Sequence, residues 1–410
     1  MSEKRRVVVT GIGVLSPVGN SMEALSAALK KNQSGIRKMP EWDGIENLRS
    51  KVAGVCEDID EKIIPRKYRR TMGRVAILSS IAAIDAVRDS GLDEADISSQ
   101  GCGVSFGSTE GSTTSMEKFF NQASTKHSLK GLQSSAYLQF MSHTCAANLA
   151  ILFQAKGPLI ASCTACVAGS QGIGFGYEAI KQGRASVMIT GGAEEMHFMN
   201  AGVFDIMRAT STEYNEKPDL TPRPFDKARD GLVVGEGGAC LVLEDYEHAK
   251  KRDARIYAEI KGFGNNCDGS HLTSPGVEGL ISAINLSLKY SGLSSDDIGH
   301  VNAHATGTEA GDIAESNAIF SVFGKKTPVS GFKGYMGHTL GACGGIESII
   351  TILMMREGFM APTKNLETPD PLCSPINHVI GDVRDTKFSI GMNNNFAFGG
   401  INTSLIFSLV

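Results

Sequence analysis

The sequence contains no run of about 18 or more apolar residues and no marked excess of one charge. A membrane-spanning helix needs about 20 such residues, so none is expected. The 410 residues include 40 Lys and Arg against 44 Asp and Glu, a formal net charge of −4. This balance gives no electrostatic reason to expect nucleic acid or an anionic membrane as the main partner. Any basic docking site must therefore be local.

Zinc-ligand spacings and a disulfide framework are also missing. The nine cysteines are scattered and odd in number, and most lie among small apolar residues, which is typical of reduced, packed thiols. Cys163 and Cys166 form a lone CxxC pair without a second pair, so no metal site is expected. The apolar stretch after the basic start, Val7 to Val9, is too short for a signal-peptide core, and we expect a cytoplasmic protein.

Glycine, by contrast, is abundant, with 47 residues against an ordinary usage of about 7 %. Segments of strand and helix character alternate from end to end, which predicts an α/β fold with a buried sheet. Residues 162–183 predict a strand end, a turn and a helix, and residues 340–355 predict a second helix; both helices are rich in glycine. Each glycine costs a helix roughly 0.5 to 1 kcal/mol relative to alanine, so we expect both helices to be buried where backbones approach closely.

The pattern of the first part of the chain begins again after Arg255. Each part has a strand, a loop with a reactive side chain, a helix crowded with Gly and Ala, and an apolar strand, and residues 237–243 resemble residues 399–406 in place and character. Internal duplication is the simplest interpretation. No Pro- or Ser-rich linker separates the parts, so residues 1–251 and 252–410 are predicted to form two halves that share one core.

Cys166 is the first candidate for chemistry. It lies on a predicted turn that opens a helix, where unpaired backbone N–H groups and the positive end of the helix dipole favour a nucleophilic thiolate. The alternative for any of the cysteines is a buried structural thiol. We keep that interpretation for Cys163, which lies on the preceding predicted strand.

Two histidines, His304 and His338, follow predicted strand ends in the second half, beside small residues that let a substrate come close. A single histidine is more often structural, but two in matching loops, together with a cysteine at a helix start, favour a site. This combination suits acyl transfer followed by carbanion formation. The thiolate carries the acyl group, and the imidazoles hydrogen-bond the thioester oxygen on which negative charge develops.

Four motifs together resemble the Cys-His-His β-ketoacyl-acyl carrier protein synthases. They are Ala165-Cys-Val-Ala-Gly, His304-Ala-Thr-Gly-Thr, Lys333 with Gly337-His-Thr-Leu-Gly-Ala, and Asn395-Phe-Ala-Phe-Gly-Gly. The similarity covers essentially the whole chain. It implies a thiolase fold, with two βαβαβαββ halves in a five-layer αβαβα sandwich, and a dimer paired through the strand Leu159 to Ser162. It implies no cofactor, because substrates arrive on the phosphopantetheine of acyl carrier protein.

The resemblance also assigns the catalytic residues. Cys166 would accept the acyl group, and His304 and His338 would promote decarboxylation of the malonyl thioester, so that the acyl chain grows by two carbons with loss of CO₂. Lys333, with Glu315, would hold the loop of His338 and its charge state. The alternative for Lys333 and Glu315 is a plain buried ion pair.

Substrate binding is assigned in the same way. Thr306 and Thr308 would hydrogen-bond the phosphopantetheine arm. The backbone N–H groups of the nucleophile and of Phe398 would form the oxyanion hole, and Phe398, in one motif with Phe396, would gate between acyl-loaded and malonyl-accepting states. The loop Asp268 to Gly279 would be a second mobile element. The alternative for the two phenylalanines is plain core packing.

A basic stretch on this otherwise acidic chain suits an acidic carrier protein. Its six cations are Lys62, Arg66, Lys67, Arg69, Arg70 and Arg74. The alternative is a solvated helix face.

Two departures from the family pattern stand out. Ala397 replaces a glycine in the gate and should restrict its hinge, and Glu213 stands where the family often has Arg or Lys, which weakens one carrier contact.

Residues 393–404 and the residues after the nucleophile resemble ketosynthases of bacterial aryl-polyene and related type II polyketide pathways more than housekeeping fatty-acid enzymes. The partner would then be a chain-length factor, a homologue whose nucleophile is lost; a homodimer is the other possibility. Competing functions are a non-catalytic chain-length factor, a housekeeping fatty-acid ketosynthase, and a thiolase or coenzyme-A-priming synthase. The retained Cys166, His304 and His338 argue against the first, and the second imidazole argues against the last pair.

Overall fold

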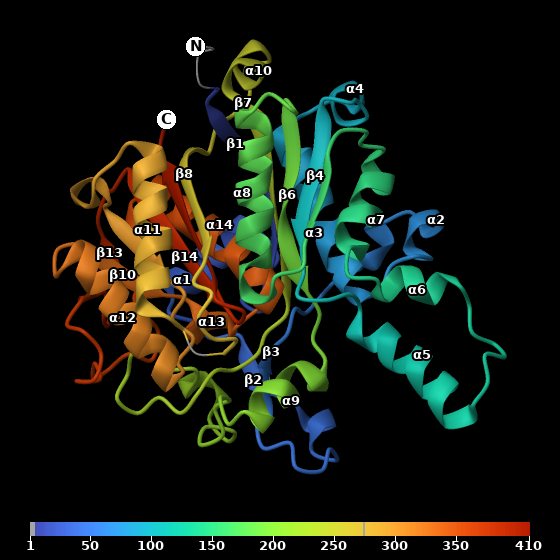
Figure 1. Cartoon of the computed structure of the whole chain (residues 1–410), viewed down its shortest axis with the longest axis horizontal. Helices are drawn as coiled ribbons and strands as arrows, with labels where there is room; N and C mark the ends of the chain where they lie inside the picture. Colours follow the sequence, from blue (N-terminus) through green and yellow to red (C-terminus); the bar gives the residue numbers. More distant parts are fainter. Residues whose placement is uncertain (1–4, 274) are drawn as a thin grey trace.

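A computed structural model of the chain describes residues 5–273 and 275–410 (Figure 1). The main elements of the first half are β1 (Val7–Leu15), α3 (Arg74–Ser90), β4 (Cys102–Gly107), α7 (Thr144–Phe153), β5 (Leu159–Ser162), α8 (Ala168–Lys181), β6 (Val187–Glu194) and β7 (Gly237–Asp245). Those of the second half are β8 (Ala258–Cys267), α11 (Val277–Ser291), β9 (His300–Ala303), α12 (Glu309–Phe323), β10 (Pro328–Gly331), α14 (Cys343–Glu357), β14 (Ile390–Ala397) and β15 (Ile401–Ser408). Both runs read βαβαβαββ, as predicted.

Shorter elements join these. The helices are α1 (Met22–Lys30), α2 (Arg66–Arg69), α4 (Glu94–Ile97), α5 (Thr113–Lys126), α6 (Ser135–Phe140), α9 (Phe198–Ile206), α10 (Tyr246–Lys251) and α13 (Lys333–Met336). The strands are β2 (Ile36–Lys38), β3 (Val52–Gly54), β11 (Phe359–Met360), β12 (Asn377–His378) and β13 (Arg384–Asp385). Single 3₁₀ turns, η3 (Ala165–Val167) and η6 (Leu340–Ala342), precede α8 and α14.

The sheet shows the duplication directly. Its strand order is β12-β10-β9-β14-β15-β8-β1-β7-β6-β4-β5. The five main strands of each half can be numbered in chain order, and outward from the central β8–β1 contact they then stand in the order first, fifth, fourth, second, third in both halves. In both, the first two pairings are antiparallel and the last two are parallel. The predicted duplication is therefore confirmed. The division at residues 251 and 252 falls between α10 and β8 and stays a prediction.

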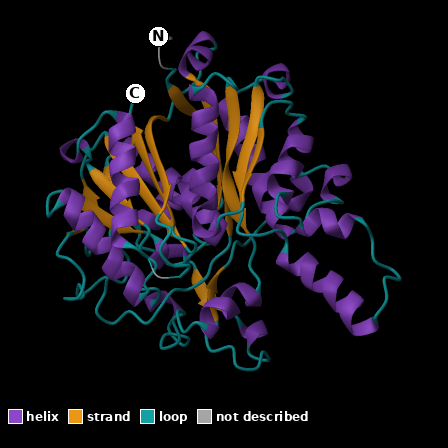
Figure 2. Cartoon of the chain, viewed as in Figure 1, coloured by secondary structure: helices purple, strands orange, loops and turns teal. Residues whose placement is uncertain are grey.

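The two halves of the sheet meet only briefly, where Val7 to Val9 pair with residues 258–260, and they enclose α8 and α14 (Figure 2). Helices α3 and α7 cover the outer face of the first half, and α11 and α12 cover that of the second (Figure 1). This is the five-layer αβαβα sandwich of the thiolase fold. Within the described part of the chain, no helix is long and apolar enough to cross a membrane.

The glycines of α8 lie where the expected close approaches occur. A Cβ on Gly169 would lie 2.7 Å from the carbonyl oxygen of Gly341, at the start of the other central helix. A Cβ on Gly172 would lie 2.4 Å from the carbonyl oxygen of Gly191 on β6. Real Cβ atoms do not come this close to backbone, so alanine is excluded at both positions without a shift of a helix or strand.

We predict that Gly172→Ala destabilises the protein by about 1–3 kcal/mol, because the added methyl overpacks the interface between α8 and β6. The measurement is chemical or thermal unfolding followed by circular dichroism. Gly202→Ala in α9 is the matched control, since a Cβ there meets nothing within 4 Å, and it should be neutral or slightly stabilising. Equal stability of the two variants would contradict the argument.

Candidate active site

Cys166 lies in η3, immediately before the first residue of α8. The preceding residue, Ala165, has a φ of 51°, a left-handed conformation that is unfavourable for a non-glycine residue. This sharp turn carries the chain from β5 into the helix. It places the buried thiol at the amino-terminal end of α8, as the sequence predicts.

Both candidate histidines come from the second half and face this thiol. Nε2 of His338 lies 2.8 Å from Sγ of Cys166. The rings of His304 and His338 are 5.1 Å apart at an interplanar angle of 84°. All three side chains are buried. The structure therefore brings together the three residues that the sequence singled out, across the boundary between the halves.

The partners of the ring nitrogens determine which tautomer each histidine adopts. The backbone N–H of Leu340 points at Nδ1 of His338 across 3.3 Å, and the Lys333 ammonium lies 3.2 Å from Nδ1 of His304. Both Nδ1 atoms thus face donors and must act as acceptors, which places the proton of each neutral ring on Nε2. Two N–H donors consequently point into the space beside Cys166.

Lys333 and Glu315 hold the site differently from the prediction. The side chain of Lys333 binds the first histidine rather than the second: its ammonium donates to the carbonyl oxygen of His304. Its ion-pair partner is Glu347, at 2.6 Å, and not Glu315. The Glu315 carboxylate instead accepts the backbone N–H groups of His304 and Ala305 at 2.7 and 2.6 Å. It shapes the loop of the first histidine.

Burial dominates the electrostatics of these groups. It lowers the pKa of both His304 and His338 well below the usual range, and the Lys333 ammonium acts in the same direction. Burial raises the pKa of Cys166 to about 12, against the effect of Lys333, and that of Glu315 to about 8, against its two backbone hydrogen bonds. The imidazoles are therefore neutral donors at physiological pH.

This donor set does not suit a metal ion. Cys166, His304 and His338 offer ligand atoms within 4.8 Å of one another, as do His304, Cys343 and Glu347. In the first group, however, each histidine directs an N–H, and not a lone pair, toward the space where the ion would lie. In the second, the ammonium of Lys333 already binds both the carboxylate and the imidazole. A cation would have to displace that charge.

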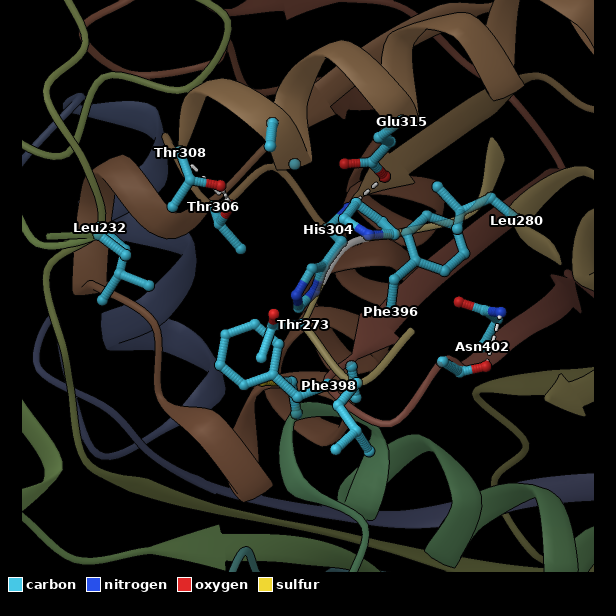
Figure 3. Close-up of a pocket in the computed structure, with 18 of the residues that line it drawn as sticks. Leu232, Thr273, Leu280, His304, Thr306, Thr308, Glu315, Phe396, Phe398 and Asn402 are labelled. Atoms are coloured by element: carbon cyan, nitrogen blue, oxygen red, sulfur yellow. Dashed lines mark hydrogen bonds between the residues drawn. The ribbon is translucent and has the colours of Figure 1, made fainter. Parts of the chain in front are cut away.

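A cavity of about 430 Å³ leads from these residues to the surface. Its lining is largely apolar, and Thr306, Thr308, Phe396, Phe398 and Asp268 all contribute to it, as predicted for substrate-binding residues (Figure 3). The two threonine hydroxyls are 2.9 Å apart, so each retains capacity for a further hydrogen bond. The dimensions and chemistry fit an extended, mostly apolar substrate with a few polar groups.

Phe398 lies at the mouth of the cavity, 38 % exposed, with its ring 5.8 Å from that of Phe204. Gly399 and Gly400 follow with positive φ values of 88° and 69°, whereas Ala397 ends strand β14 without a left-handed φ. The alanine is therefore unstrained in this conformation.

The second loop is hydrogen-bonded to this turn. The backbone N–H of Asp268 donates to Gly400 at 2.9 Å and that of Gly399 to Leu272 at 2.7 Å, while the carboxylate of Asp268 accepts the N–H of Ser270. The predicted mobile loop at 268–279 includes residue 274, which lies outside the described residues. The gating role of both loops stays a prediction.

The basic stretch is only partly available for docking. Lys62, Arg66, Lys67 and Arg70 are exposed, on and around α2. Arg69 is half-buried. Arg74 instead forms a two-pronged ion pair with the buried carboxylate of Glu236, at 2.8 and 2.6 Å. Including Arg74 in the docking surface was therefore wrong, because its charge is committed within the fold.

Sequence reasoning gave no role to three residues of the site: Glu347, Asn395 and Cys343. Glu347 binds Lys333, Asn395 donates to Glu347 at 2.6 Å, and the thiol of Cys343 lies 3.1 Å from the carbonyl oxygen of Cys166. One signal was available. Glu347 is a single carboxylate within the apolar helix 343–355, and a buried charge requires a partner.

Comparison with known protein families agrees with this geometry. Residues 4–249 match "Beta-ketoacyl synthase, N-terminal domain" and residues 257–367 match "Beta-ketoacyl synthase, C-terminal domain". The chain belongs to the beta-ketoacyl synthase family. Family membership confirms the resemblance drawn from the motifs.

Individual relatives span the whole chain. It is 36 % identical to 3-oxoacyl-[acyl-carrier-protein] synthase 1 of Haemophilus influenzae, over 98 % of both proteins. A beta-ketoacyl synthase structure from Burkholderia phymatum superimposes with a TM-score of 0.96 at 44 % identity, covering 99 % of this chain and 100 % of the other. The ishigamide ketosynthase/chain length factor gives 0.93 at 30 % identity and covers all of both chains.

We predict that His304 and His338 remain neutral, with the proton on Nε2, at pH 6.5, where an ordinary histidine is about half protonated, because burial lowers their pKa values well below the usual range. Two-bond ¹H–¹⁵N spectra of histidine-labelled protein report the tautomer and charge directly, with assignment by His304→Ala and His338→Ala. Free imidazole in the same tube serves as the titrating reference. An imidazolium signal from either ring near pH 6.5 would refute the assignment.

Proposed function

We propose that the chain is a 3-oxoacyl-[acyl-carrier-protein] synthase that carries out a decarboxylating condensation on Cys166. The observation that carries this proposal is the contact between one buried thiol and two imidazoles that both present N–H donors. The relative from Haemophilus influenzae bears this activity in its name, and the three residues that the reaction needs are present and assembled here.

In the first half-reaction the thiolate of Cys166 attacks the thioester carbonyl of an acyl carrier protein. A C–S bond forms to Cys166, and the carrier thiol leaves with a proton. Burial opposes formation of the thiolate, while the Lys333 ammonium and the start of α8 favour it. The backbone N–H groups of Cys166 and Phe398 are our proposal for the oxyanion hole.

In the second half-reaction a malonyl thioester occupies the cavity. Its carboxylate leaves as CO₂, and the electron pair of the broken C–C bond passes to the thioester oxygen as an enolate. The Nε2–H groups of His304 and His338 stabilise that charge. The enolate carbon then attacks the acyl thioester on Cys166, so the chain gains two carbons. The C–S bond to Cys166 breaks, and the thiolate that leaves takes up a proton from solvent or attacks the next acyl thioester. Thr306 and Thr308 are proposed to hold the phosphopantetheine arm, and no bound cofactor takes part in this scheme.

Partner and pathway are further parts of the proposal. The edge strand β5 leaves Leu159 47 % exposed, which supports pairing with a second ketosynthase-like chain through this edge. The resemblance to a ketosynthase/chain length factor structure supports a heterodimer with a chain-length factor and elongation of a polyene or other type II polyketide; a homodimer in fatty-acid synthesis is the alternative. The retained Cys166 disfavours a non-catalytic role for this chain. We place the reaction in the cytoplasm.

We predict that Cys166→Gln lowers condensation below about a thousandth of the wild-type rate, because no nucleophile remains, while malonyl decarboxylation is kept or rises. His338→Ala should have the opposite effect: decarboxylation is lost and acylation of Cys166 stays measurable. Mass spectrometry of the intact protein after incubation with acyl-carrier protein, and release of ¹⁴CO₂ from labelled malonyl-carrier protein, separate the two steps. An unmodified Cys166 in the wild type would refute the proposal.

We also predict that reversing the four exposed cations of the basic stretch, Lys62, Arg66, Lys67 and Arg70, to glutamate raises KM for the carrier protein about tenfold or more and weakens its salt dependence. The kcat should change little, since these residues do not line the cavity. The matched control reverses four other exposed lysines, none of which lines the cavity: Lys251, Lys289, Lys325 and Lys387. Equal effects in both variants would indicate net charge rather than docking.

A further inference from the structure

Asn395 is the one buried amide that touches the charged centre of the site from the gate strand, within the described residues. It lies on β14, three residues before Phe398, and its side chain is fully buried. Asn393 and Asn395 share the face of β14 that packs on α14. Asn394 points to the opposite face, as strand alternation requires.

The orientation of the Asn395 amide follows from its neighbours. Its oxygen accepts the amide N–H of Asn393 at 3.2 Å, so its nitrogen faces the opposite way. That nitrogen donates to Oε2 of Glu347 at 2.6 Å. It also lies 3.5 Å from Nδ1 of His304 and 3.8 Å from the sulfur of Cys343.

Glu347 therefore has both oxygens satisfied by donors that also face His304. The Lys333 ammonium holds Oε1 at 2.6 Å and Asn395 holds Oε2. The same ammonium lies 3.2 Å from Nδ1 of His304. If Asn395 lost its amide, Oε2 would lose this hydrogen bond in a buried space, and an unsatisfied buried carboxylate oxygen is strongly unfavourable.

We infer that Asn395 is a positioning residue, whose amide keeps Glu347 paired with Lys333 and so keeps the ammonium on Nδ1 and the proton on Nε2 of His304. This inference rests on the proposed function only for its catalytic consequence. The mechanism described above does not use Asn395. Its side chain does not line the cavity; it acts through Glu347 and Lys333 and faces the non-reacting Nδ1 of His304.

The expected pH dependence has a defined sign. The groups around the Glu347 carboxylate are Lys333 from α13, His304 after β9, Cys343 from α14 itself, and Cys166 from η3 beyond it. Burial raises the pKa of Glu347, and Lys333 and Asn395 both lower it. Removing the amide therefore raises that pKa. In the variant, Glu347 therefore becomes protonated at a higher pH than in the wild type, and as the pH falls Lys333 loses its negatively charged partner earlier.

The test compares Asn395→Leu with Asn394→Leu. Leucine matches asparagine in shape and removes the amide. Asn394 is the matched control because it is equally buried, one residue away on the same strand, and its amide has no hydrogen-bond partner among the described residues. Malonyl-carrier protein decarboxylation is measured from pH 5 to 9, and acylation of Cys166 is measured at pH 7.5.

In Asn395→Leu we expect the acid limb of the decarboxylation profile to move up by about one pH unit, the size expected for loss of one hydrogen bond to a charged group. Acylation of Cys166 at pH 7.5 should change less than about threefold, because its reacting atoms are untouched. Asn394→Leu should follow the wild type in both. A wild-type acid limb in Asn395→Leu, or an equal shift in Asn394→Leu, overturns the inference.

A second readout does not depend on activity. The His304 ring ¹⁵N resonances should respond to pH between about 5 and 7 in Asn395→Leu but not in the wild type or Asn394→Leu. A wild type without decarboxylase activity would refute the proposed function, while this spectrum would still decide the role of Asn395. If Asn395→Leu does not fold, Asn395→Ala is used instead, with the same expected directions and the same refuting results.

Discussion

The contact between the two central helices is the constraint on which the site depends. Helix α8 begins just after Cys166, and the turn η6 that leads into α14 begins just after His338, so the distance between these two turns sets the distance between nucleophile and imidazole. Glycine makes that distance possible. A Cβ on Gly169 would lie 2.7 Å from the oxygen of Gly341, and any larger side chain would separate the helices and lengthen the 2.8 Å contact between His338 and Cys166.

The second requirement is a positive charge where water is absent. Lys333 is 1 % exposed and stays charged because Glu347 is next to it. Burial lowers its pKa more than any other single effect, but the charge and hydrogen bond of Glu347, together with Cys343 and Glu315, raise it, so the net direction is upward. The ammonium in turn favours neutral histidines, since it lowers the pKa of both rings. The buried ion pair of Lys333 and Glu347 thereby keeps both imidazoles neutral, so each ring offers an N–H donor and neither carries a charge.

Much of this arrangement is encoded locally and could be predicted. The alternation of strands and helices, the repeat, and the helix starts at Cys166 and at residues 340–343 are properties of short segments, and they predict the βαβαβαββ halves. His304 directly follows β9, as predicted, whereas helix α13 separates His338 from the end of β10; His338 was found from the small residues of its loop rather than from a correct strand end. The helical arm α5–α6 was not predicted: α5 does have an apolar face, but its sequence is polar on average and almost none of it is buried.

The partners of the buried charges could not be predicted from the sequence. Glu315 is 18 residues before Lys333 and Glu347 is 14 after it, and spacing alone does not decide between them. The choice depends on how α12 and α14 face the loop of His304, which is set by tertiary packing. Arg74 shows the same limit. Its basic neighbours suggest a surface, but the carboxylate that binds it, Glu236, is 162 positions away.

The duplicated fold also explains why one half supplies the nucleophile and the other supplies the donors. Ala165 and Leu340 open the turns η3 and η6 with nearly the same left-handed φ, 51° and 46°, so the same backbone turn is built twice. After it stands Cys166 in one half and Gly341 in the other. A side chain at Gly341 would meet the backbone of Ser108 and Thr109 within 3 Å. A second nucleophile is therefore sterically excluded at the equivalent position, and the second half contributes through its loops instead.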